Sequence, residues 1–178
     1  ERNENNMSNI KKLCGFCINE WHLTTMVLPY ISKEINNNYK IITILEKGIE
    51  ENIKLLIKKL NLKNEEKILG IDWKQSMARK YTSISNKLNI IAKTKENYII
   101  LVNGKKNYMD MVNKYIEKWL QKNRIQNEIK IINCYEITEF NYNITAILDS
   151  HDKMINTSGE KEIQEVFEDY GKTKAKKA

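Results

Sequence analysis

The residues best suited to chemistry lie close together near the N-terminus, in the stretch LCGFCINEWH from Leu13 to His22. Cys14 and Cys17 form a C-x-x-C pair, and four residues separate Cys17 from His22. Such a pair is typical of a thiol redox site or of the first half of a zinc site. In the third interpretation both cysteines are small buried apolar side chains.

The structure expected around this pair decides between the three interpretations. Residues 11–18 have the apolar, β-branched character of a strand. Strand positions i and i+3 point to opposite faces. Their Cα atoms lie roughly 10 Å apart, which exceeds the about 7 Å that a disulfide allows. A zinc knuckle would need a ligand at position 27, which is Val27. Buried cysteines are therefore favoured, and a thiol- or zinc-dependent protein using Cys14, Cys17 and His22 stays as an alternative.

The pattern of apolar residues then predicts the elements that position these side chains. Short apolar runs alternate with segments of helical period, which favours a parallel sheet with helices on both faces. The expected strands are 11–18, 39–46, 67–73, 97–104 and 128–135. The expected helices are 19–35, 49–60, one within 76–88, 107–123, 144–150 and 160–170. Pro29 predicts a kink or break in the first helix, and the T-x-x-E of Thr157 and Glu160 predicts the start of the last.

Length and composition fit a single α/β domain. The chain has 178 residues and 41% hydrophobic residues, enough for a full core. We expect a flexible segment over 1–10, one domain over 11–170 and a disordered basic tail over 171–178. No signal peptide or membrane-spanning stretch is evident, so a cytoplasmic protein without membrane contact is expected.

The net charge is +7, which raises the question of nucleic acid. Four lysines of this charge, Lys172, Lys174, Lys176 and Lys177, lie in the last eight residues. The remaining charges are mixed in sign, as on an ordinary solvated surface. Nucleic acid is therefore not expected as a partner.

A parallel sheet also raises the question of nucleotide binding. The only G-K-T is formed by Gly171, Lys172 and Thr173, and the position where the phosphate loop needs its first glycine is Val166. There is no G-x-G-x-x-G either. The sequence therefore predicts neither ATP hydrolysis nor any cofactor.

A binding site is expected where the parallel strands end, because ligands of open α/β sheets bind outside the carboxyl ends of their strands. A small, partly apolar ligand would suit the aromatic and thiol groups expected there. The candidate ligand-binding residues are Cys17, Glu20, Trp21, Glu46, Trp73, Asn103, Cys134, Tyr135 and His151.

The stretch INCYEITEFNYNITAILDSHDKMI, residues 132–155, resembles the C-terminal signature of the MEDS domain, the methanogen/methylotroph and dichloromethane-regulator sensory domain. The matching positions are Cys134, Tyr135, Phe140, Ile147, Leu148 and His151. Pro29 falls where this family has a proline. The chain departs from the family at Glu136 and Asp152, and Lys12 stands where many members have a histidine.

This resemblance implies a KaiC/RecA-like fold that lacks the catalytic motifs. It also implies a non-catalytic sensory domain that binds a small molecule and passes the signal to a regulatory protein partner, with a second copy of the chain as another candidate partner. The alternative from the residues themselves is a protein-interaction module that acts through the C-terminal helix, whose apolar residues follow a helical stripe.

Overall fold

The computed structural model describes residues 9–137 and 144–170. The strands are β1 (Ile10–Cys17), β2 (Tyr39–Leu45), β3 (Asn97–Gly104), β4 (Ile129–Glu136), β5 (Lys153–Asn156) and β6 (Gly159–Lys161). The helices are α1 (Glu20–Asn36), α2 (Glu50–Leu60), α3 (Glu65–Leu69), α4 (Tyr81–Lys93), α5 (Lys106–Lys122), α6 (Ile144–Asp149) and α7 (Ile163–Val166). None of these described helices is long and apolar enough to cross a membrane. Of the segment expected to be flexible over residues 1–10, Ile10 belongs to β1, and residues 1–8 lie outside the described residues, as does the tail 171–178.

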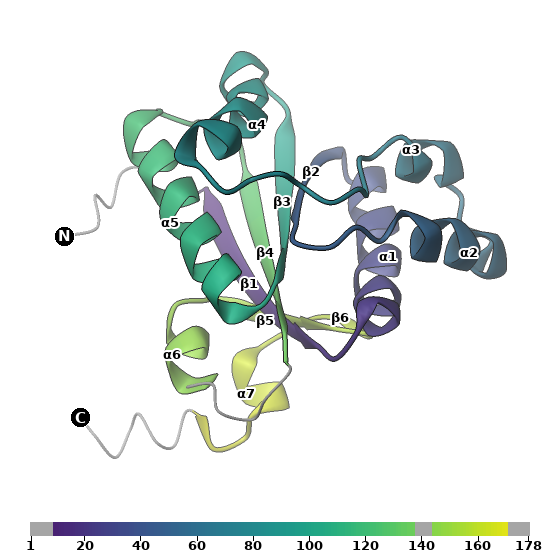
Figure 1. Cartoon of the computed structure of the whole chain (residues 1–178). Coiled ribbons are helices and arrows are strands. Elements are labelled where there is room, and N and C mark those ends of the chain that lie inside the picture. The colour runs from purple at the N-terminus through teal and green to yellow at the C-terminus, as the bar shows by residue number, and fades with distance from the viewer. Residues whose placement is uncertain (1–8, 138–143, 171–178) are drawn as a thin grey trace.

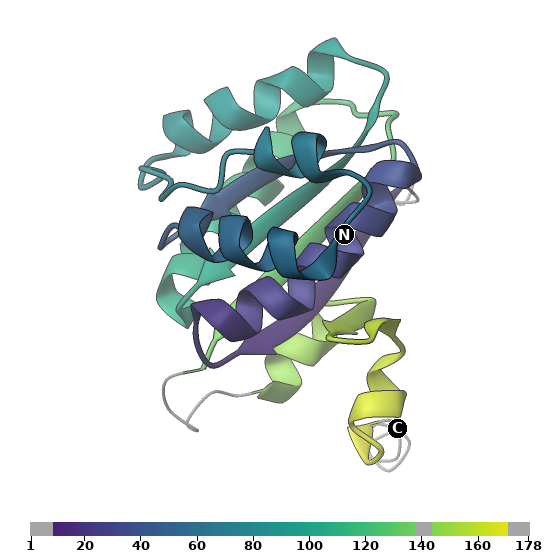
Figure 2. The same ribbon diagram turned by 90° about the vertical axis from the view of Figure 1, so that its right-hand side faces the viewer.

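The strands form one sheet in the order β2-β3-β4-β1-β5-β6. All neighbours pair in parallel except β5 and β6, which form an antiparallel hairpin. Helices α1, α2 and α3 cover one face of the sheet, and α4 and α5 cover the other (Figures 1 and 2). The predicted three-layer, mostly parallel α/β architecture is confirmed.

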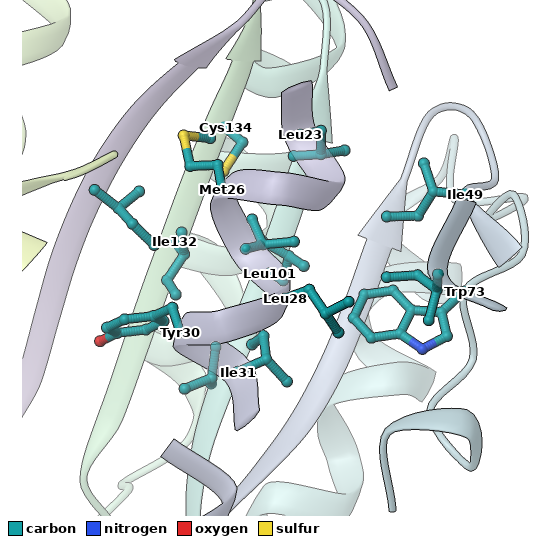
Figure 3. Packing of buried hydrophobic residues seen from close by; sticks show 14 of the residues in the cluster. Leu23, Met26, Leu28, Tyr30, Ile31, Ile49, Trp73, Leu101, Ile132 and Cys134 are labelled. Carbon is teal, nitrogen blue, oxygen red and sulfur yellow. The ribbon is translucent and has the colours of Figure 1, made fainter. Parts of the chain in front are cut away.

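Two separate apolar cores result, one on each face. Alternate residues of β3 divide between them: Ile99 and Leu101 pack under α1, whereas Ile100 and Val102 pack under α5. Figure 3 shows the first core, in which Leu28 of α1 lies beside Trp73 and Ile49. A strand buried on both faces has no polar face, which explains the unbroken apolar run of β3.

The strand predicted over 67–73 is wrong. Residues Glu65–Leu69 form α3, and the chain then runs without regular structure to α4. A short apolar run does not distinguish a buried strand from a helix turn. Asn64 and two glutamates precede the run and Gly70 follows it, and both are signals of a helix.

The segment between α3 and α4, called the irregular segment below, instead protects the free edge of β2. Leu45 N donates to Ser76 Oγ at 3.0 Å, and Ser76 N donates to Leu45 O at 2.8 Å. Lys87 of α4 donates to Thr43 O at 2.9 Å and to Ser76 Oγ at 2.8 Å. An open strand edge invites pairing with another chain, so these bonds close it without a further strand. Burial lowers the pKa of Lys87.

The helix predicted over 160–170 is also wrong. Residues Asn156 and Gly159 pair across a turn that joins β5 to β6, and only Ile163–Val166 is helical beyond it. Gly159 adopts a φ of 97°, which suits glycine in a tight turn. Asn156 Oδ1 also accepts a bond from Ser158 N at 2.8 Å, so the local turn chemistry prevails over the T-x-x-E pattern.

Helix α1 passes through Pro29 without the predicted break. Pro29 lacks an N–H, so the carbonyl one turn earlier, at Thr25, loses its helical donor. Thr25 and Pro29 both lie on the solvent side of the helix. Water can therefore satisfy that carbonyl, and the apolar side of α1 stays packed against the sheet.

A buried ion cluster joins α1, β4 and β6. Lys130 Nζ lies 2.9 Å from Glu34 Oε2, 3.2 Å from Glu160 Oε2 and 3.1 Å from Tyr30 Oη. The Glu34 and Lys130 side chains are only 5% and 12% exposed. The cluster therefore holds the C-terminal hairpin against the first helix through a charge that water cannot replace.

We predict that Lys130→Met lowers the free energy of unfolding by about 3 to 5 kcal/mol, because it leaves two carboxylates buried without their cation. Lys40→Met, which removes an exposed lysine from the edge strand β2, should change it by less than about 0.5 kcal/mol. Urea unfolding followed by circular dichroism measures both. Combining Lys130→Met with Glu34→Gln should recover part of the lost stability. A Lys130→Met variant as stable as the wild type would contradict the stabilising role of the ion cluster.

Candidate functional site

The carboxyl ends of β1, β2, β3 and β4 meet at one edge of the sheet, as expected. The structure brings together Cys17, Glu20 and Asn103, which line a small void with Asn19, Leu23, Lys47 and Glu136. Its volume is about 10 Å³, which is room for roughly one water molecule. This void is too small for the partly apolar ligand that was expected at this edge.

A hydrogen-bonded amide fills the centre of this edge. Asn103 Nδ2 donates to Cys134 O at 2.8 Å and to Cys17 Sγ at 3.5 Å. Cys17 Sγ in turn donates to Tyr135 O at 3.7 Å. These bonds link the ends of β1, β3 and β4, so Asn103 and Cys17 satisfy the backbone here instead of facing a ligand.

Glu46, at the end of β2, caps the helix that follows β3. Its Oε1 accepts a hydrogen bond from Lys105 N at 2.9 Å. A carboxylate at a helix N-terminus is stabilised by the helix dipole. Gly104 permits this approach, because a Cβ there would lie 3.0 Å from the Cβ of Glu46 and 2.6 Å from the Tyr108 ring. Glu46 is thereby committed to positioning α5.

The turn from β1 to α1 has no room for a phosphate loop. Only Ile18 and Asn19 separate the strand from the helix. Asn19 Oδ1 accepts a bond from His22 N at 2.8 Å and caps α1. His22 Nδ1 accepts a bond from Ile18 N at 3.2 Å, so His22 stabilises the same turn. Trp21 is 49% exposed and Ile18 66% exposed, both outside the small void.

The cysteines of the C-x-x-C pair lie on opposite faces of the sheet, as strand geometry predicts. Cys14 belongs to the core under α5 and Cys17 to the core under α1. Burial raises the pKa of each thiol to about 12. Burial also raises the pKa of Cys134 well above its usual range. All three cysteines are free, and no group of three or more possible metal ligands occurs among residues 9–137 and 144–170.

We predict that native protein reacts with iodoacetamide far more slowly than unfolded protein at neutral pH. The thiolate is the reactive form, and all three thiols are buried with raised pKa values. Mass spectrometry after timed alkylation, with and without guanidinium, makes the comparison. Rapid alkylation of the native protein at Cys14 or Cys17 would restore the thiol alternative.

Tyr135 and His151 lie together on the face of the sheet that α4 and α5 cover. Their rings pack edge to face with centroids 6.1 Å apart. His151 Nδ1 lies 2.6 Å from Ile147 O and Nε2 lies 3.0 Å from Asn133 Nδ2. The carbonyl requires a proton on Nδ1, so Nε2 accepts from the amide. Burial lowers the pKa of His151 to about 4, against the ordinary 6.5.

This histidine predicts a loss of stability in acid. Its pKa is lower in the folded state, so protons bind the unfolded chain more tightly. The stabilisation is complete above about pH 6.5 and is lost as the pH falls towards 4. The loss should reach roughly 3 kcal/mol at most. In urea unfolding at a series of pH values, His151→Asn should lose less stability than the wild type over this range. If the stability of His151→Asn fell with pH as steeply as that of the wild type, the assignment of this loss to His151 would be contradicted.

A larger cavity lies beside the predicted edge, between α2, α3 and the segment that follows α3. It is a cleft of about 550 Å³. Its apolar lining residues are Ile57, Leu69, Ile71 and Trp73, and its charged lining residues are Glu50, Lys54, Lys58, Glu65, Asp72 and Lys74. Of the predicted site residues only Trp73 lines this cleft. The lining residues after α2 were not expected to face a site because 67–73 was assigned to a strand, and those on α2 carry no signal beyond the exposed face of an ordinary amphipathic helix.

Trp73 is held rigidly at the base of this cleft. Its side chain is 2% exposed, and its Nε1 donates to Ile68 O at 2.8 Å. Its carbonyl accepts a bond from Ile49 N, the residue before α2, at 2.9 Å. Asp72 O accepts a bond from the Thr43 hydroxyl of β2. The cleft is thus connected to β2 through the Thr43 side chain and to the start of α2 through a backbone bond.

Comparison with known proteins supports the fold. No protein-family model matches this sequence, and no curated protein matches it. Among solved structures, the chain is similar to the crystal structure of the RadB recombinase, with a TM-score of 0.50 and 10% sequence identity. The alignment covers 82% of this chain and 72% of that one. The fold is RecA-like. At this identity the similarity concerns the fold alone.

Proposed function

We propose that this chain is a non-catalytic sensory domain on a RecA-like scaffold, and that it binds a small amphipathic molecule in the cleft between α2 and α3. The observation that carries the proposal is the cleft itself. Its volume of about 550 Å³ falls within the roughly 300–1,000 Å³ of small-molecule sites. The resemblance of residues 132–155 to the sensory MEDS domain supports the same function.

The lining of the cleft defines the chemical class of the ligand. Leu69 is 43% exposed although it is apolar, and with the partly buried Ile71 it offers a surface for a hydrocarbon or aromatic group, with Ile57 and Trp73 packed beneath. Three lysines and three acids also line the cleft. A molecule with an apolar body and one or two charged ends fits this combination better than a purely apolar compound or a polyphosphate.

The short β1–α1 turn supports the non-catalytic part of the proposal. A phosphate loop cradles its anion with a run of backbone N–H groups between a strand and a helix. Here two residues make that connection, and Glu20 and Glu136 lie beside it. A carboxylate-lined void of this size is unfavourable for a triphosphate.

The signal would leave the cleft through the segment that closes the edge of β2. The cleft ends at Trp73 and Lys74, and Ser76 is bonded both to β2 and to Lys87 of α4. A ligand that shifts Trp73 would therefore shift α4 on the opposite face. A regulatory protein partner that contacts α4 would detect this change.

The alternative of an interaction module acting through a C-terminal helix has less support. That helix was expected over 160–170, but α7 spans only Ile163–Val166. Ile163 is buried in the core of the domain. The segment therefore docks mainly on its own sheet.

The cleft can be tested with 1-anilinonaphthalene-8-sulfonate, a fluorescent probe that combines aromatic rings with one anionic group. We predict saturable binding to the native protein and competition by octanoate. Leu69→Trp should fill the cleft and weaken binding roughly tenfold or more, which corresponds to about 1.4 kcal/mol. Leu55→Trp should leave it unchanged, because Leu55 is similarly exposed but lies outside the cleft.

Circular dichroism should confirm that both variants fold. Equal binding by the two variants, or no saturable binding by the native protein, would overturn the assignment of the cleft.

A further inference from the structure

The charges of this protein are divided unevenly along the chain. Residues 18–72, which include α1, α2 and α3, contain eight Lys and Arg and eight Asp and Glu. Residues 73–127, which include α4 and α5, contain twelve Lys and Arg but only three Asp and Glu. No acid occurs between Asp72 and Glu96. The excess of this segment is larger than the net charge of +7 of the whole chain.

Two of the three acids in this segment are already paired. Glu96 lies 4.0 Å from Lys40, and Asp110 lies 2.7 Å from Lys106. Of these three acids, only Glu117 forms no ion pair with another described residue. Most of the positive charge of residues 73–127 therefore has no acidic partner within that segment, and further acids on the same face of the sheet come from α6 and α7.

The basic side chains of the two helices meet where the helices cross. Lys118 Nζ and Lys122 Nζ lie 4.3 Å and 5.2 Å from the centroid of the same ring, that of Tyr81. Tyr81 is the first residue of α4 and follows Lys80. Lys80, Lys118 and Lys122 are all exposed. We call Lys80, Tyr81, Lys118 and Lys122 the basic patch.

The helix packing fixes this arrangement. Trp119, between the two lysines of α5, is 1% exposed, and its Nε1 donates to Asn89 Oδ1 of α4 at 3.0 Å. Tyr81 and Tyr115 also pack edge to face at 6.0 Å. Like charges held close together repel each other and gain when an anion is placed between them.

We propose that the α4–α5 face binds the phosphate backbone of a nucleic acid. A phosphate backbone presents anions in series, which suits basic residues spread over two helices. The polar residues Thr82, Ser83, Ser85 and Asn86 add hydrogen-bond donors on α4. An anionic membrane is the weaker candidate, because α5 carries no large exposed apolar side chain and α4 carries only Ile90.

This inference differs from the expectation drawn from the sequence, which treated the charges outside the tail as evenly mixed. The total charge hides the excess of residues 73–127, because residues 128–170 contain ten Asp and Glu but only three Lys and Arg. The tail carries four further lysines, so any test must separate its contribution from that of the patch.

The test is fluorescence anisotropy of a labelled DNA duplex of mixed sequence, titrated with the whole chain at several salt concentrations. The triple variant Lys80→Gln, Lys118→Gln, Lys122→Gln should bind about tenfold or more weakly. The slope of log K against log salt should fall by roughly 2 to 3, since each lost phosphate contact removes about 0.9.

Two control variants make the result specific. Lys59→Gln, Lys63→Gln, Lys67→Gln removes the same charge from exposed positions on and beside α2 and α3 and should retain most of the affinity. A third variant replaces the four tail lysines with glutamine and should still show the salt slope of the patch. Equal losses in the first two variants would reduce the effect to net charge and overturn the proposal.

Two further results would also overturn it. One is loss of all binding in the tail variant together with unchanged binding in the patch variant. The other is binding to vesicles rich in phosphatidylserine without binding to the duplex.

Discussion

The free edge of β2 is the constraint on which much of this structure depends. A parallel sheet buried on both faces must still satisfy the backbone groups of its edge strands. Here Ser76 bonds the N–H and the carbonyl of Leu45, and the side chain of Lys87 donates to the carbonyl of Thr43. The chain can make these bonds only if it crosses the edge of the sheet, from the α1–α3 face to the α4–α5 face. That crossing determines where the cleft and the basic patch lie.

The crossing segment also connects the two proposed surfaces. Trp73 lies in the first core and lines the cleft, whereas Ala78, five residues later, lies in the second core. Between them the chain is bonded to β2. A ligand in the cleft and a nucleic acid on α4 would therefore act on opposite ends of one short, firmly held segment, which offers a direct physical path for coupling between the two sites.

The carboxyl edge of the sheet has a structural role here. In an open α/β sheet this edge is the usual place for a ligand. In this chain Asn103, Glu46 and Asn19 each satisfy a backbone group of a neighbouring strand or helix. Those side chains are therefore occupied, and the remaining void is about 10 Å³. The larger space lies at the side of the same edge, where α3 and the irregular segment diverge from α2.

The sequence by itself determined the parallel sheet, four of its strands and most of its helices, because burial on both faces leaves long apolar runs such as that of β3. It also determined the fate of the C-x-x-C pair, since the period of a strand separates Cys14 from Cys17 whatever surrounds them. Only the tertiary structure decided that residues 67–73 form no strand and that 153–161 form a hairpin. Short segments have weak local preferences, and their partners lie far away in the sequence. The basic patch also required the fold, because composition records how many lysines there are, and only packing shows that Lys118 and Lys122 lie over the ring of Tyr81.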